Sequence, residues 1–137
     1  MTPHFLSPLL GPGQPQCRIV TADGRIVARR LEPAFDAATR KRGLLGRTSL
    51  DPDTALVIAP CNAVHTCFMR FPIDIVFVAR NGRVTKTATG VRPWRLAVSP
   101  RAFATVELAA GVIARHGLRA GDRLTVESAS SPTTCGG

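Results

Sequence analysis

Residues 73–78, the sequence Ile-Asp-Ile-Val-Phe-Val, constrain the fold more than any other stretch because Asn81 and Gly82 follow them. An Asn-Gly pair favours a two-residue type I′ turn, so residues 73–80 should pair antiparallel with residues 83–88. Side chains alternate between the two faces of a strand, and both faces of this one are mostly apolar. We therefore expect a central strand of a sheet that is covered on both sides.

Short apolar segments separated by turn residues recur along the chain. Asp23 and Gly24 predict a second hairpin, and the strands expected in addition are 17–21, 25–31, 55–59, 64–69, 103–108 and 123–127. Short helices are predicted over 35–42, with Phe35, Ala38 and Thr39 facing the core, and over 110–116. The pattern indicates a mainly β protein: a compact antiparallel β-sandwich or partly closed barrel, jelly-roll-like, with one or two short helices.

The length of 137 residues predicts a single domain. We place it at residues 17–127, between a Pro/Gly-rich N-terminal arm (1–16) and a flexible C-terminal tail (128–137), both poorly ordered unless they dock. The chain lacks an apolar run long enough to cross a membrane, and residues 1–16 lack the pattern of a secretory signal. The default expectation is a cytoplasmic protein with reduced thiols.

The chain is strongly basic, with 18 Lys and Arg against 9 Asp and Glu and a formal charge of +9. Such a balance favours anionic partners. The cations nevertheless occur in short clusters, such as 40–42, and no tract of five or more is present. We do not expect specific recognition of nucleic acid, and a basic, nucleic-acid-associated protein is kept as an alternative.

Two carboxylates stand among apolar residues of expected strands. Asp74 lies on a mostly buried face, where a carboxylate must be hydrogen-bonded, paired or protonated. It could accept hydrogen bonds from loop amides, pair with Arg70, or act directly in a site. Glu107 shares a strand face with Phe103 and Thr105, and it could pair with an arginine or contribute to the same site.

A cluster of thiols and a histidine precedes Asp74. His65 and Cys67 would lie about 6.6 Å apart on one strand face, a spacing that two zinc ligands can bridge, with His116 or Glu107 as conceivable further ligands. Cys61 lies about 13 Å from His65 along a straight strand, so we expect no metal and no other cofactor. Cys61 beside His65 could alternatively form a thiol nucleophile that Asp74 or Glu107 orients.

Trp94 is the only tryptophan of the chain and lies between Arg92 and Arg95. An aromatic side chain flanked by arginines can stack on a ring or a sugar of a ligand. It can equally cover the end of a barrel. The sequence does not decide between the two.

Four segments together resemble one family. They are RKRGLLGRTSL at 40–50, HTxxMRFPID at 65–74 with the Asn-Gly turn after it, VELAAG at 106–111 and GLxxGD at 117–122. Their order is similar to that of the domain-of-unknown-function 192 family of small uncharacterised bacterial proteins. The resemblance implies a compact β-rich, jelly-roll-like domain with no established activity, whose members are often exported. Cys67-Phe68 departs from the Phe-Gly expected there.

The resemblance and the residues together predict a candidate pocket. Its residues are Cys61, His65, Arg70, Asp74, Trp94 and Glu107. We expect a non-catalytic module that binds a small polar or anionic ligand, or an envelope-associated protein partner. The alternative is a hydrolase or a thiol- or metal-dependent enzyme that uses Cys61, His65 and Asp74.

Overall fold

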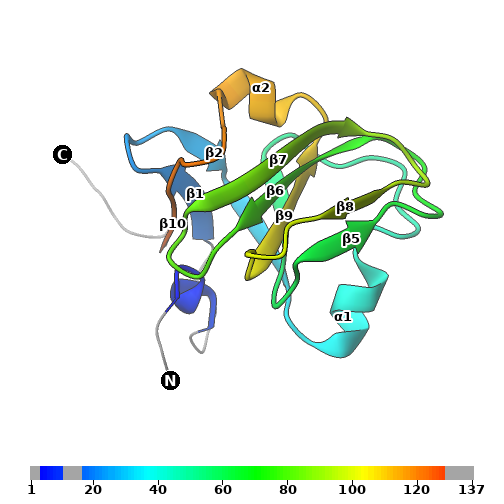
Figure 1. Ribbon diagram of the computed structural model, residues 1–137, viewed down its shortest axis with the longest axis horizontal. Coiled ribbons are helices and arrows are strands. Elements are labelled where there is room, and N and C mark those ends of the chain that lie inside the picture. Colours follow the sequence, from blue (N-terminus) through cyan, green and yellow to red (C-terminus); the bar gives the residue numbers. More distant parts are fainter. Residues whose placement is uncertain (1–3, 11–16, 129–137) are drawn as a thin grey trace.

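The computed structural model describes residues 4–10 and 17–128 (Figure 1). Within these ranges the protein is mainly β, with two short α-helices, as the sequence predicts. The strands are β1 (Cys17–Thr21), β2 (Ile26–Ala28), β3 (Arg30–Ala34), β4 (Thr54–Ile58), β5 (Ala63–His65), β6 (Ile73–Val78), β7 (Val84–Val91), β8 (Leu96–Val98), β9 (Ala104–Ala109) and β10 (Leu124–Ser128). The helices are η1 (Ser7–Leu10, 3₁₀), α1 (Ala37–Arg42) and α2 (Val112–His116).

The strands form three sheets, with the orders β10-β1-β2, β3-β4-β9-β6-β7 and β5-β8. β3 and β4 run parallel, whereas the other named pairs are antiparallel. The described sheets are therefore mostly antiparallel, and the parallel pair lies at one edge of the five-stranded sheet. None of the described sheets closes on itself, so the partly closed barrel is wrong.

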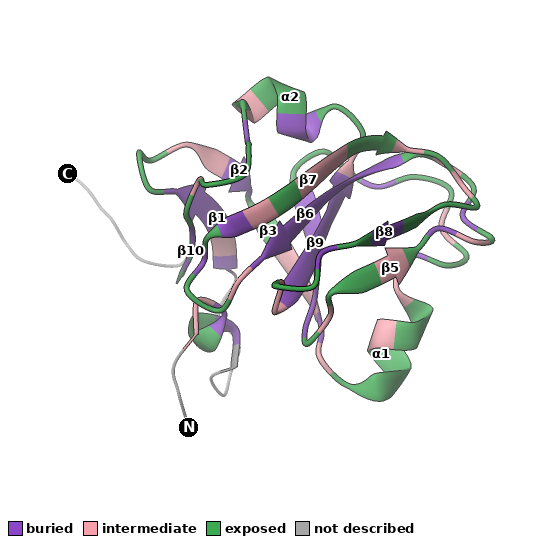
Figure 2. Ribbon diagram, in the orientation of Figure 1, coloured by how far each residue is buried: buried purple, intermediate pink, exposed green. Residues whose placement is uncertain are grey.

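The five-stranded sheet has an apolar core on each face. Along β6, Val76 and Val78 belong to a core shared with β1, β2, β10 and α2. Ile75 and Phe77 point the other way, into a core completed by Leu44, Leu50, Met69 and Ala97. Figure 2 shows β6 and β9 buried along their length. The predicted central strand, covered on both sides, is confirmed.

Both predicted hairpins are confirmed. β1 pairs with β2 around Asp23 and Gly24, and β6 pairs with β7 around Asn81 and Gly82. The single strand expected over 25–31 is wrong, because the chain leaves the first sheet at Arg29 and continues as β3 of another. The N–H groups of Arg29 and Arg30 both donate to the carbonyl of Asp53, which fixes this passage.

The two predicted helices form, but the inward face expected for α1 is wrong. α1 has no buried residue, and its Ala38 and Thr39 are exposed. Asp36 caps its start by accepting from the N–H of Thr39 at 2.8 Å. α2 ends at Gly117 in a left-handed conformation, as a C-terminal glycine favours.

Part of the N-terminal arm docks on the domain. Leu6 and Leu9 are buried in the first core, and the N–H of Phe5 donates to the carbonyl of Arg80 at 2.9 Å. The rest of the expected arm and the tail beyond residue 128 lie outside the described residues. Among the helices that the structure describes, none has the length and apolar character needed to cross a membrane.

Candidate functional site

Asp74 is fully buried on the face of the five-stranded sheet that meets α2. Its carboxylate accepts hydrogen bonds from the N–H groups of Gly90 at 2.8 Å, Gly111 at 3.0 Å and Ile113 at 2.9 Å. Gly111 precedes α2 and has no side chain that could cap the helix, so Asp74 supplies that acceptor. This geometry matches the interpretation of Asp74 as an acceptor for loop amides that ties β6, β7 and α2 together.

Glu107 lies on the opposite face, on the middle strand β9. Its register neighbours are Leu56 on β4 and Ile75 on β6, and only 6% of the residue is exposed. No described residue donates a hydrogen bond to its carboxyl group. Burial raises the pKa of Glu107 to about 7, and the charge of Arg47 partly offsets the rise. Near neutral pH a large fraction of Glu107 therefore carries a proton that it can donate.

Arg47 is already held by another carboxylate. Its guanidinium donates to both oxygens of Glu32, at 2.5 Å and 3.3 Å, and this pairing raises the pKa of Arg47. This bidentate pair uses two of the five N–H donors of the guanidinium, and no described hydrogen bond joins Arg47 to Glu107. Arg47 thus acts on Glu107 through its charge and leaves the carboxyl group without a hydrogen bond from it.

A pocket of about 450 Å³ lies over Glu107. Most of its lining comes from the end of α1 with the residues after it, the turn between β4 and β5, and β5 itself, while β4, β9 and the loop after β5 contribute one residue each. Its exposed cationic residues are Lys41 and Arg42, beside the half-buried Arg40, and its polar residues include Cys61, Asn62, His65 and Glu107. The buried apolar lining is Leu44, Ile58 and Met69, with the half-buried Val64 beside it. The pocket therefore combines a basic mouth, an apolar interior and one buried carboxyl group.

Cys61 and His65 line this pocket without bonding to each other. The thiol of Cys61 donates to the carbonyl of Ala63 at 3.3 Å, and Nδ1 of His65 accepts from the N–H of Cys67 at 3.3 Å. Within the described ranges no hydrogen bond joins the thiol to the imidazole. The nucleophilic pair considered from the sequence is not assembled in this geometry.

The strand expected over 64–69 forms only in its first part, because β5 ends at His65. The chain then turns through Phe68, whose φ is +67°, a left-handed value that is rare outside glycine. His65, Cys67 and Met69 consequently do not share one strand face, and Cys67 does not line the pocket. The described part of the chain gathers no three His, Cys, Asp or Glu side chains in a metal-binding cluster.

The six candidate residues divide into three places. Cys61, His65 and Glu107 meet at the pocket, whereas Asp74 lies beyond the sheet that separates the two cores. Arg70 and Trp94 are exposed and outside the pocket lining. A single cleft containing all six is not formed.

The pocket residues that sequence reasoning missed are Arg40, Lys41, Arg42 and Asn62. In the sequence the cationic triplet is one of several short basic clusters, and nothing in its spacing ties it to a segment 20 residues further along the chain. It also lies within the first family-like segment, 40–50, which is the one sequence indication that could have included it.

Comparison with known proteins places this geometry in context. The DUF192 family model, described as "Uncharacterized ACR, COG1430", matches residues 18–126. A crystal structure from Sinorhizobium meliloti 1021, described as a "putative transcription regulator", is similar with a TM-score of 0.72 and 26% identity, covering 82% of this chain and 92% of that chain. A protein of unknown function from Novosphingobium aromaticivorans DSM 12444 gives 0.69 and 25%, covering 80% and 82%. No curated protein matches the chain.

Proposed function

This chain belongs to the DUF192 family, and we propose that it is a non-catalytic binding module whose pocket over Glu107 holds a small organic anion with an apolar body. The observation that carries the proposal is the burial of the Glu107 carboxyl group without a hydrogen-bond partner among the described residues. A carboxyl group that is almost fully buried and accepts no hydrogen bond within the described protein is costly, and a ligand that supplies the missing partner would offset this cost.

The chemistry of the lining favours an anion with an apolar body. Arg40, Lys41 and Arg42 concentrate positive charge at the mouth, and a guanidinium presents a fork that matches a carboxylate or phosphate. The interior is lined by apolar side chains such as Ile58 and Met69. Protonated Glu107 can donate to a ligand oxygen, and the volume is that of an ordinary small-molecule site.

A binding role is favoured over the thiol-enzyme alternative by the local hydrogen bonds. Cys61 and His65 line the pocket but each bonds to a backbone group instead of to the other. A nucleophilic thiol needs a base within hydrogen-bond reach. If Cys61 alkylates as rapidly at pH 6 as an unperturbed thiol does only in alkaline solution, the thiol-enzyme alternative is supported and the non-catalytic proposal is contradicted.

Calorimetric titration with hexanoate tests the proposal, with hexan-1-ol as the uncharged probe. We expect hexanoate to bind and hexan-1-ol to bind at least tenfold more weakly. Ionisation of Glu107 would repel the anion, so affinity should fall about tenfold between pH 6 and pH 8. Glu107→Gln keeps an N–H donor without the titration, so its affinity for hexanoate should lack this fall.

A charge-matched pair of variants locates the binding. Arg40→Gln with Arg42→Gln should weaken hexanoate binding about tenfold, because both cations line the pocket. Arg119→Gln with Arg123→Gln removes the same charge from exposed positions around β10 and should leave the affinity unchanged. Undetectable hexanoate binding, or an equal effect of the two double variants, would contradict the proposed site.

A further inference from the structure

Five large apolar side chains of the described residues are exposed: Leu45, Phe68, Trp94, Leu96 and Val98. All except Leu45 belong to the β5–β8 sheet and the loops at its end. We call Phe68, Trp94, Leu96 and Val98 the aromatic face. Phe68 is 70% exposed, Trp94 58% and Leu96 71%, and none of the four lines the pocket over Glu107.

The backbone holds the two rings outward at an energetic cost. Phe68 and Trp94 are the described non-glycine residues with positive φ, +67° and +66°. This conformation costs an L-residue roughly 1–2 kcal/mol, and burial of the rings does not repay it because both are exposed. Their rings contact each other edge to face, with centroids 4.6 Å apart. Strain of this kind at an exposed position is typical of functional surfaces.

The strained loops are fixed by Thr66, which is buried between them. Its hydroxyl donates to the carbonyl of Arg92 at 2.6 Å and accepts from the N–H of Arg95 at 2.8 Å. Its carbonyl accepts from the N–H of Trp94 at 3.1 Å, and its own N–H donates to the carbonyl of Arg95 at 2.8 Å. The two rings are therefore presented by a rigid base and not by a loose loop.

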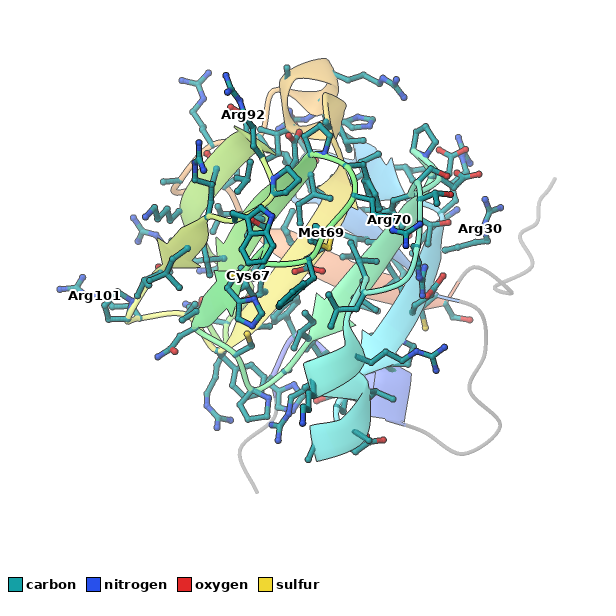
Figure 3. The ribbon with its side chains drawn as sticks, turned by 90° about the vertical axis from the view of Figure 1, so that its right-hand side faces the viewer. Arg30, Cys67, Met69, Arg70, Arg92 and Arg101 are labelled. Carbon is teal, nitrogen blue, oxygen red and sulfur yellow. The ribbon has the colours of Figure 1, made fainter. Side chains whose placement is uncertain are left out.

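Positive charge surrounds the aromatic face, and acidic residues are missing from it. Exposed arginines in the same loops are Arg70, Arg92 and Arg95, and the exposed Arg101 follows β8. Figure 3 looks at this side of the molecule, with Cys67 near the centre and Arg92, Arg101 and Arg70 around it. Between residues 54 and 106 the sequence has one acidic residue, Asp74, and that one is buried.

We propose that the aromatic face docks this protein on an anionic lipid bilayer. Trp and Phe side chains favour the interface between headgroups and acyl chains, and Leu96 and Val98 would add aliphatic contact below the headgroups. Arginines near an anionic bilayer are attracted to its surface. The observations favour a bilayer over single-stranded nucleic acid because the face is half aliphatic, whereas bases stack on rings. A fluid bilayer also needs no shaped groove.

Trp94 reports directly on this event, since the protein contains one tryptophan and no tyrosine. The full chain is titrated with vesicles of equal phosphatidylglycerol and phosphatidylcholine, with pure phosphatidylcholine vesicles and with a single-stranded oligonucleotide. We expect a blue shift of emission and protection from acrylamide with the anionic vesicles, weakened by added salt. Emission unchanged by anionic vesicles, or changed by the oligonucleotide instead, would overturn the proposal.

Variants separate docking by this face from general attraction of a basic protein. Phe68→Gly removes a ring at a backbone conformation that glycine adopts freely, so the fold should stay stable while vesicle co-sedimentation falls about tenfold. Arg92→Gln with Arg95→Gln should reduce it similarly, while Arg119→Gln with Arg123→Gln, of equal charge, should not. If both double variants lose binding equally, or Phe68→Gly keeps it, the aromatic face is not the docking surface.

Discussion

At the scale of single residues, two buried carboxylates of one sheet differ in their surroundings. Asp74 meets three N–H donors on one face, and Glu107 meets none among the described residues on the other. Both could be identified from the sequence as carboxylates in apolar strands. Their separation by the sheet could not, because it depends on the register that pairs β9 with β4 and β6.

Glu107 should give stability a specific dependence on pH. Its pKa is about 7 in the folded protein and 4.5 ordinarily, so the folded state holds the proton more tightly. Its contribution is complete below about pH 4.5 and declines as the pH rises to about 7, by about 3 kcal/mol in all. Glu107→Gln should lack this decline.

Urea unfolding of both proteins between pH 4 and pH 8 measures the effect. The difference in unfolding free energy between the variant and the parent should shift by about 3 kcal/mol in favour of the variant as the pH rises. Other titrating groups cancel in this difference. A difference that stays constant with pH would show that the pKa of Glu107 is the same in the folded and the unfolded protein.

At the scale of elements, turn chemistry made the hairpins predictable and non-local pairing made other strands unpredictable. Asp23-Gly24 and Asn81-Gly82 fix their hairpins locally. β8 was missed because three residues, Leu96 to Val98, carry little periodicity, and β5 partners them from more than 30 positions away. The passage at Arg29 was missed because it depends on the carbonyl of Asp53.

Two hairpin glycines should differ sharply in their tolerance of a side chain. Gly24 and Gly82 have similar φ values, +93° and +90°, so alanine is strained at both. At Gly24 an added Cβ meets open space, whereas at Gly82 it overlaps the carbonyl of Leu124 on β10. Gly24→Ala should cost about 1 kcal/mol and Gly82→Ala about 3 kcal/mol or more in urea unfolding. If both variants lose the same unfolding free energy, the backbone of Leu124 on β10 moves away from the added Cβ at no cost.

At the scale of the whole molecule, two cores share one sheet. The strand at 73–78 is apolar on both faces, so two cores could be predicted from the sequence. That the N-terminal segment contributes to one of them could not be predicted, because its prolines and glycines give no periodic pattern. Leu6 is fully buried there. Only some of the pocket residues could be predicted, namely Cys61, His65 and Glu107. The others come from segments such as α1, whose approach to β5 and β9 depends on the tertiary fold.

Leu6→Ala should test whether the N-terminal segment belongs to the domain. Removing a fully buried leucine costs about 2–5 kcal/mol, so the urea midpoint should fall clearly. Leu96→Ala, at a position 71% exposed, should change stability by less than about 0.5 kcal/mol. If the two variants unfold alike, residues 4–10 do not contribute to the core in solution.

The pairing of β1 with β10 has a consequence for the order of events during synthesis. Arg18 and Glu127 form an ion pair on these neighbouring strands although 109 positions separate them in the sequence. β1 therefore emerges from the ribosome long before β10, the strand that pairs with its edge. Until β10 has been synthesised and has left the ribosome, the nascent chain exposes an unpaired edge, and this is the interval in which a chaperone would protect it.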